Sequence, residues 1–250
     1  MIVDSMTHTE VYKELDKDIA EVTAWWIGMR VTLEKIAKWT TKLPFERWYE
    51  YTSTRHNRYL VYCVIMGRNY NNDSMTAPMA LRKMDRGWTV YTYHFPWQHR
   101  AGKHVILPHV FDRYHDPGRG NVPKTGINLI KHLFEHNNHG EVLRGDKFSG
   151  RSVRYKGRDN LCKCINDGIM LGEMIGDIFV AHSFITYEMA GGLQREEFER
   201  NRENIVSNEE LLAQHKIEDK QEMQVMREQI LQEIAMEKKY GKTNLIQVKQ

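Results

Sequence analysis

Residues 160–187 have the sequence NLCKCINDGIMLGEMIGDIFVAHSFITY, in which three apolar runs are separated by turn-forming residues. Asp167-Gly168 is a pair typical of the tight turn that joins two antiparallel strands. The flanking runs, 160–165 and 168–174, have the length and the Ile content of strands. Residues 177–187 form a third run, the most apolar of the three. This stretch therefore predicts three consecutive strands of a mainly antiparallel sheet.

Further elements are predicted on the N-terminal side of this stretch. Candidate strands lie at about 141–145 and 151–155, and the aromatic and β-branched run Trp88–Phe95 is typical of another. Residues 105–114 fit a short strand that turns into a helix, and Thr125 can cap a helix that runs to about Asn137. We therefore predict an α+β domain over residues 85–190, with a small, mainly antiparallel sheet and one or two packed helices.

The N-terminal flank, residues 1–75, is predicted to be a helical hairpin. Thr7 and Glu10 have the spacing of a capping box, and Pro44 suits the first turn of a second helix. Apolar residues recur at three- and four-residue spacing along both predicted helices, as in Leu15, Ile19, Val22, Trp26, Met29, Leu33, Ile36, Phe45, Trp48, Tyr51, Tyr59, Tyr62 and Cys63. This spacing favours core packing over a ligand site.

The C-terminal flank, residues 191–250, is predicted to be a long helical extension. Ser207 and Glu210 form a second capping box, and a narrow apolar stripe follows, at Met223, Met226, Ile230 and Ile234. A stripe of this width suits docking on the N-terminal hairpin or on another chain, so self-association through this helix is one hypothesis.

Composition excludes several classes of protein. The chain has 250 residues, of which 41% are hydrophobic and 28% charged, so it can bury a sizeable core. No uncharged apolar run reaches the length of about 18 residues needed to cross a membrane. Three cysteines are too few for a disulfide framework, and we expect a cytoplasmic protein. Motifs for nucleotide loops and for α/β hydrolases do not occur, and we expect no cofactor.

Charge is distributed unevenly along the chain. Residues 1–50 carry 7 Lys and Arg against 9 Asp and Glu, residues 51–160 carry 18 against 8, and residues 161–250 carry 11 against 16. A basic centre between acidic ends suggests a surface that attracts phosphates, if these cations gather on one face.

Two groups of residues suggest metal binding, both weakly. His132, Glu135 and His136 match the H-x-x-E-H pattern of inverted zinc peptidases, with Glu209 or Glu210 as a conceivable third ligand. Chance matches are frequent in a histidine-rich segment, and exposed helix histidines explain the pattern as well. Cys162 and Cys164 would point to one face of a strand near His182, but no second cysteine pair completes a structural zinc site.

A denser group of histidine and arginine lies at His109, Arg113, His115 and Arg119. His109 and Arg113 are four residues apart and would share one face of a helix. A His-x-x-x-Arg helix, a second helix and antiparallel strands that end in an apolar strand with a threonine resemble the RelE/BrnT-type toxin ribonucleases over about residues 104–187. The segment also resembles uncharacterised proteins of Bacteroides-type bacteria and their phages.

The resemblance to the toxin ribonucleases implies RNA cleavage without a metal ion. His109 and His115 would serve as acid and base while the ribose 2′-hydroxyl attacks the adjacent phosphate. Arg113, Arg119 and Arg158 would hold the phosphate oxygens, with Tyr155 or His182 facing them from the sheet. Residues expected to contact nucleic acid are Arg151, Arg154, Tyr155 and Arg158. The alternative is a non-enzymatic binding or assembly protein of a phage or mobile element, with the methionine-striped helix as an interaction surface.

Overall fold

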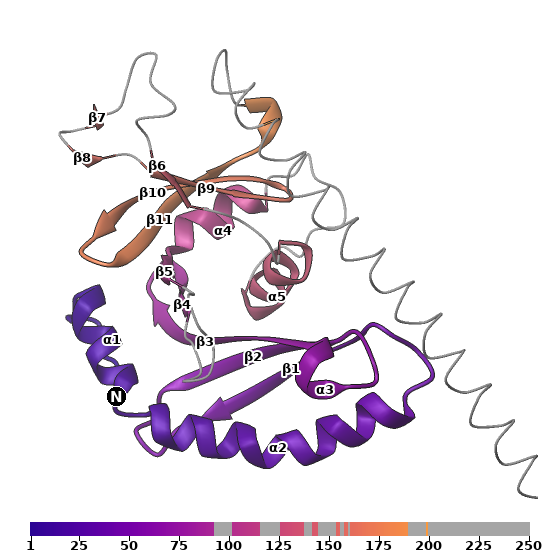
Figure 1. Cartoon of the computed structure of the whole chain (residues 1–250). Helices are drawn as coiled ribbons and strands as arrows, with labels where there is room; N and C mark the ends of the chain where they lie inside the picture. Colours follow the sequence, from indigo (N-terminus) through magenta and orange to yellow (C-terminus); the bar gives the residue numbers. More distant parts are fainter. Residues whose placement is uncertain are drawn as a thin grey trace, which may run out of the picture. The chain divides into compact units, whose positions relative to one another are not determined.

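The computed structural model describes residues 1–92, 102–115, 126–137, 142–144, 154–155, 158–159, 161–189 and 199. The chain divides into two compact units, residues 1–205 and 206–250, and all of the described residues belong to the first. Within them, helices and a mostly antiparallel sheet confirm the predicted α+β class (Figure 1). No helix of the described part is long and apolar enough to span a membrane.

Nine strands form one sheet in the order β1-β2-β3-β4-β5-β11-β10-β9-β6. The first four are β1 (Phe45–Thr52), β2 (Arg58–Ile65), β3 (Ser74–Met84) and β4 (Gly87–Thr92). The others are β5 (Lys103–Ile106), β6 (Val142–Arg144), β9 (Leu161–Ile165), β10 (Gly168–Ile175) and β11 (Ile178–Ile185). All neighbours are antiparallel except β5 and β11, which are parallel and join the two halves of the sheet.

The three strands predicted from residues 160–187 are confirmed as β9, β10 and β11. Asp167-Gly168 forms the turn between the first two, with Gly168 at φ +156. The register of β10 against β11 shifts between Leu171 and Gly172. A Cβ atom built on Gly172 would lie 2.2 Å from the Val180 carbonyl oxygen, so only glycine lets the two backbones approach this closely.

The predicted strand-to-helix segment and the second predicted helix are also confirmed, as β5 followed by α4 (Pro108–Tyr114) and as α5 (Gly126–His136). Both helices pack on one face of the sheet, where Val110, Phe111, Leu129, Ile130 and Leu133 are buried. Between β5 and its parallel neighbour β11 the chain passes through α4 and α5 and then through β6 to β10, so these helices form the first part of the crossover.

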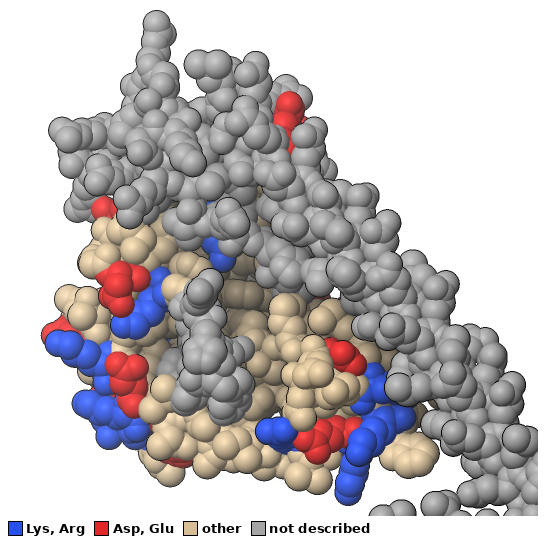
Figure 2. All heavy atoms as spheres, viewed as in Figure 1, with Lys and Arg blue, Asp and Glu red and all other residues tan. Residues whose placement is uncertain are grey.

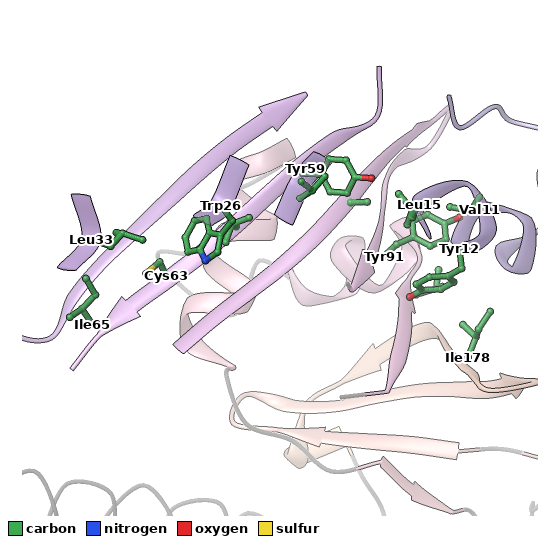
Figure 3. Packing of buried hydrophobic residues seen from close by; sticks show 14 of the residues in the cluster. Val11, Tyr12, Leu15, Trp26, Leu33, Tyr59, Cys63, Ile65, Tyr91 and Ile178 are labelled. Atoms are coloured by element: carbon green, nitrogen blue, oxygen red, sulfur yellow. The ribbon is translucent and has the colours of Figure 1, made fainter. Parts of the chain in front are cut away.

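The other face of the sheet is covered by α1 (His8–Asp16) and α2 (Ile19–Trp39). The predicted Thr7–Glu10 capping box is present at the start of α1. In Figure 3, Trp26 and Leu33 of α2 lie beside Cys63 and Ile65 of β2, while the α1 residues Val11, Tyr12 and Leu15 lie near Tyr91 and Ile178. Figure 1 shows α2 along one side of β1 and β2 and α5 on the other.

The prediction of a second helix in the N-terminal hairpin is wrong, because residues 45–65 form β1 and β2. β2 lies between β1 and β3, and seven of its eight residues are buried. A strand that is buried on both faces is a continuous apolar run, which periodicity alone does not distinguish from a buried helix. The short helix α3 (Tyr70–Asp73) then leads into β3. β3 spans residues 74–84 and pairs with β2 and β4, so one sheet continues across the predicted boundary between 75 and 85.

Two other predicted elements are covered only in part by the described residues. The strand predicted at 151–155 is present only as β7 (Arg154–Tyr155), which pairs with β8 (Arg158–Asp159) in a separate two-stranded sheet. A 3-10 helix, η3 (Tyr187–Met189), follows β11. The long C-terminal helix predicted within 191–250 lies outside the described residues, apart from Glu199.

Candidate functional site

A pocket lies between α5 and the sheet, on the face that carries both crossover helices. Its floor comes from five neighbouring strands and its roof from the C-terminal half of α5. The pocket is small and partly enclosed, with a cavity volume of about 30 Å³. Its lining residues are Thr92, His104, Ile106, Leu133, Phe134, Asn137, Lys163, Ile165, Met170 and Phe179. The lining is mostly apolar and contains few polar groups, which is typical of a small-ligand site.

Lys163 is the one cationic side chain among those lining residues. It stands in the middle of β9, opposite Met170 of β10 and Val142 of β6. No described residue forms a hydrogen bond or ion pair with its ammonium group, and burial is the one cause of its pKa shift. The side chain keeps some solvent exposure, and burial lowers the pKa of Lys163 to about 8. Within the described part of the chain, the pocket therefore contains a cation without a counter-charge.

His104 and Thr92 supply polar groups at the β4–β5 side of the pocket. Thr92 Oγ1 accepts a hydrogen bond from the His104 backbone N–H at 2.9 Å, which ties β5 to β4 beyond their paired residues. The His104 ring meets the Phe179 ring edge-on, with centroids 5.8 Å apart. His104 and Lys163 therefore both line the pocket, from strands on opposite sides of β11 and β10.

A hydrogen-bond network fixes the C-terminal end of α5 over the pocket. The Tyr114 hydroxyl, at the end of α4, donates to the Asp167 carboxylate in the β9–β10 turn. Asn137 Nδ2 donates to Asp167 Oδ2 at 2.9 Å, and Asn137 Oδ1 accepts from the Asp167 backbone N–H at 2.9 Å. His132 Nδ1 lies 3.2 Å from the Tyr114 hydroxyl oxygen. We call these four residues the α5 latch, because they join both helices to the turn that precedes β10.

The outer side of α5 contacts the first strand of the sheet. Trp48 Nε1 in β1 donates to the Glu135 carboxylate at 2.6 Å, and Lys131 Nζ lies 3.4 Å from Glu50 Oε1. The roof of the pocket is thus attached to β1 on one side and to the β9–β10 turn on the other.

The side chains of the H-x-x-E-H pattern interact with one another and with neighbouring protein groups. The rings of His132 and His136 stack at a centroid distance of 4.0 Å, and His136 Nδ1 lies 2.9 Å from the His132 carbonyl oxygen. Glu135 accepts from Trp48. Among the described residues, no three His, Cys, Asp or Glu side chains are grouped as metal ligands. Glu209 and Glu210 lie outside the described part of the chain.

α4 brings together only two of the predicted catalytic residues. His109 and Arg113 are exposed and one helical turn apart, while Val110, Phe111 and Tyr114 on the other side are buried. His115 follows the last residue of α4, six positions after His109, so at about 100° per residue it points to a different side. The His115 Nδ1 atom is buried and has no hydrogen-bond partner. His109 and His115 therefore do not face one site from this helix.

The remaining predicted nucleic-acid contacts are only partly described. Arg119 and Arg151 lie outside the described residues. Arg154, Tyr155 and Arg158 are all in the β7–β8 hairpin, where the backbone pairs Tyr155 with Arg158.

Several cations of the basic central segment are paired with acids, and Arg68 instead donates to backbone carbonyl oxygens at the end of α2. Arg58 lies 2.9 Å from Glu50, Lys103 lies 3.0 Å from Asp177, and Arg55 contacts Glu14 at 2.5 Å. On the face shown in Figure 2, described Lys and Arg side chains lie beside Asp and Glu. Among the described residues, the sequence-level excess of positive charge is therefore not one continuous basic patch on that face.

The predicted group of sheet cysteines and histidine is described in part. Cys162 is a buried thiol, while the side chain of Cys164 is not among those described. His182 Nε2 lies 3.0 Å from Glu173 Oε1 on the neighbouring strand β10.

Sequence analysis missed Lys163. The available signal was a single lysine in the middle of the apolar run Leu161–Ile165, which is an unusual position for a charge. Thr92 and His104 had no signal, because the crossover that brings them close to α5 is a long-range feature. Comparison with protein-family models, with curated proteins and with solved structures gives no match for this chain.

Proposed function

We propose that the chain binds a small anionic ligand, bearing a carboxylate or a phosphate, in the pocket beneath α5. The observation that supports this function is the uncompensated Lys163 ammonium group among largely apolar lining residues. The Tyr114, Asn137 and Asp167 contacts, which fix the roof, support a preformed site rather than a gap between loosely packed elements.

The physical argument concerns the free energy of a buried charge. A cation that is removed from water without a counter-charge is unfavourable, which is why its pKa falls. An anion that enters the pocket restores the missing counter-charge, and its attraction to the ammonium is stronger there than in bulk water. Apolar neighbours such as Phe179 and Met170 keep competing water away from the pair. The ligand class therefore follows from the sign of the unpaired charge.

Anion binding is tested with acetate and inorganic phosphate as probes. We expect either or both to raise the melting temperature of the full chain, and to shift backbone NMR resonances of Lys163, Met170 and Phe179. Lys163→Met should remove these effects, whereas Lys83→Met, at an exposed lysine of β3, should keep them. Shifts of equal size in the Lys163→Met protein would contradict the proposal.

A second candidate function is RNA binding with metal-independent cleavage. The observation that favours it is the exposed pair His109 and Arg113 on one face of α4. In this proposal His109 exchanges a proton with the ribose or the leaving group, and Arg113 neutralises the phosphate. Because α4 turns His115 to another side, the second acid or base has to come from elsewhere, and the β7–β8 hairpin with Arg154, Tyr155 and Arg158 would add phosphate and base contacts.

Labelled single-stranded RNA in excess EDTA tests this second function. Cleavage that is abolished by His109→Ala and by Arg113→Ala, but retained in Arg86→Ala, would support it. A gel shift without cleavage would favour nucleic-acid binding alone. Cleavage that persists in both α4 variants would rule out this face as the site.

A further inference from the structure

We propose that Lys163 is a nucleophile that forms an imine with a small 2-oxo carboxylate held in the pocket beneath α5. This inference rests on the proposed anion-binding function and adds a chemical class of ligand and a covalent step to it. It stands on three features of the structure, namely the position of the amine, its lack of partners and the composition of the pocket walls.

The position of Lys163 suits a reacting group. Its side chain extends from the middle of a strand that is paired on both sides, so its backbone is fixed by the ladders to β10 and β6. Lys163 lines a pocket that is partly enclosed, between the sheet and α5. A reacting group on a regular strand is placed more reproducibly than one on a loop.

The surroundings of Lys163 favour the neutral amine, which is the form that attacks a carbonyl carbon. No carboxylate of the described residues pairs with it, and apolar side chains such as Ile165, Met170 and Phe179 share the pocket. Burial lowers the pKa of Lys163 to about 8, so about half of the amine is neutral at that pH. An ordinary lysine, with a pKa of about 10.4, is almost entirely protonated under the same conditions.

The proposed step balances without an oxidant or a reductant. The Lys163 ammonium first releases a proton, and the Nζ lone pair of the neutral amine then forms a bond to the ketone carbon as the carbonyl π bond breaks. A proton moves from the nitrogen to the carbonyl oxygen to give a neutral carbinolamine. The proton released first returns to the hydroxyl, which leaves as water, so the protonated imine carries the single positive charge of the original ammonium. His104 lines the same pocket from β5 and is a second titratable side chain among its lining residues.

A carboxylate next to the carbonyl fits both charge states of the site. Before reaction it supplies the counter-charge that Lys163 lacks, and after reaction it lies beside the protonated imine. A neutral aldehyde or ketone would leave this cation unpaired in an apolar pocket, which is unfavourable. The ligand class is therefore a small 2-oxo acid rather than a carbonyl compound in general.

Reductive trapping tests the inference. The full chain is incubated with pyruvate and cyanoborohydride, digested, and mapped by peptide mass spectrometry. We expect the mass of one reduced pyruvate on Lys163, formed preferentially because at neutral pH its neutral fraction is on the order of 100-fold larger than that of an ordinary lysine. The rate of labelling should rise with pH up to about 8 and level off above it. Acetate should slow labelling by competing for the pocket.

Matched variants distinguish the possible failures. The Lys83→Met protein should be labelled like the unmodified chain, and the Lys163→Met protein should lose the adduct. Mapping of the labelled site on the unmodified chain does not depend on whether Lys163→Met folds. Labelling spread evenly over the lysines would overturn the inference. If acetate binds at Lys163 but pyruvate gives no adduct, the imine is excluded and anion binding stands. If neither acetate binding nor an adduct is found, both proposals fall.

Discussion

Lys163 and Asp18 show opposite ways to place a charge inside this protein. Asp18 is 0% exposed, and its Oδ2 atom accepts hydrogen bonds from Ser53 Oγ at 2.7 Å, Asn57 Nδ2 at 2.8 Å and Tyr59 Oη at 2.9 Å. Lys163 has no such partners among the described residues. A buried carboxylate that accepts three hydrogen bonds on one oxygen contributes to the fold, whereas a buried charge without such bonds is a candidate for binding or chemistry.

Replacement of Asp18 by alanine should destabilise the protein strongly. Three donors and the nearby Arg55 guanidinium, whose Nε lies 3.5 Å from Asp18 Oδ1, would lose their acceptor inside the core. We expect the free energy of unfolding to fall by about 3–5 kcal/mol, compared with about 1–2 kcal/mol for Ser53→Ala. Urea denaturation of both variants measures this difference, and equal losses would mean that Asp18 is not the centre of the network.

Replacement of Lys163 by methionine should instead stabilise the ligand-free protein. The pKa of Lys163 is about 8 in the folded chain and about 10.4 when unfolded, so between these values the unfolded chain binds more protons. The stability of the unmodified protein therefore rises from pH 8 to about 10.4, while below pH 8 it carries the whole cost of the buried charge.

We accordingly expect the free energy of unfolding of Lys163→Met at pH 7 to be about 1–3 kcal/mol larger than that of the unmodified protein. This difference should shrink toward pH 10. Lys83→Met should show no such pH dependence. A variant that is less stable than the unmodified chain at pH 7 would indicate that Lys163 has a favourable partner.

At the scale of elements, the β10–β11 hairpin depends on a close approach of two backbones. Gly172→Ala would place a methyl group 2.2 Å from the Val180 carbonyl oxygen and 2.9 Å from the Phe179 ring, where the register shifts. We expect a loss of about 1–3 kcal/mol in the free energy of unfolding. Gly28→Ala, in α2 where a Cβ meets nothing within 4 Å, serves as the control and should be neutral or stabilising. Equal stability of the two variants would argue against the close approach.

The α5 latch connects helix packing to the site. Tyr114→Phe removes the hydroxyl that donates to Asp167 and leaves the buried ring in place. We expect a decrease of about 1–3 kcal/mol in the free energy of unfolding, together with weaker acetate binding, because the roof of the pocket is less firmly held. Thermal unfolding and acetate titration measure both effects. Unchanged acetate affinity in a destabilised variant would show that the latch serves folding alone.

Elements with strong local signals were predicted well from the sequence. The Asp167-Gly168 turn, the Thr7–Glu10 capping box and the short helix after Pro108 each depend on a few neighbouring residues, and all three are present. Residues 45–65 were predicted as a helix because their aromatic residues happen to fall at helical spacing. Residues 45–65 form strands because they pair within the sheet and pack against helices. These contacts are long-range, so the local spacing of residues does not show them.

At the scale of the whole molecule, the pocket exists because the crossover between β5 and β11 first places α4 and α5 on the sheet and then adds β9 and β10 to it. This crossover brings Thr92, His104 and Lys163 to one helix, although they are separated by up to 71 positions in the sequence. The pattern around His109 and Arg113 is local and could therefore be recognised in the sequence, whereas the pocket could not. The exposed α4 face and the pocket are different sites, and each has its own experiment.

The central claim is that Lys163 is an unpaired cation whose missing partner is an anionic ligand, and lysine NMR tests it most directly. In protein labelled with ¹³C-lysine, one side-chain resonance that is absent from Lys163→Met should titrate near pH 8. Added acetate or pyruvate should move its midpoint upward. If every lysine titrates near the ordinary pKa of about 10.4, or if the anions leave the Lys163 midpoint unchanged, the claim is contradicted.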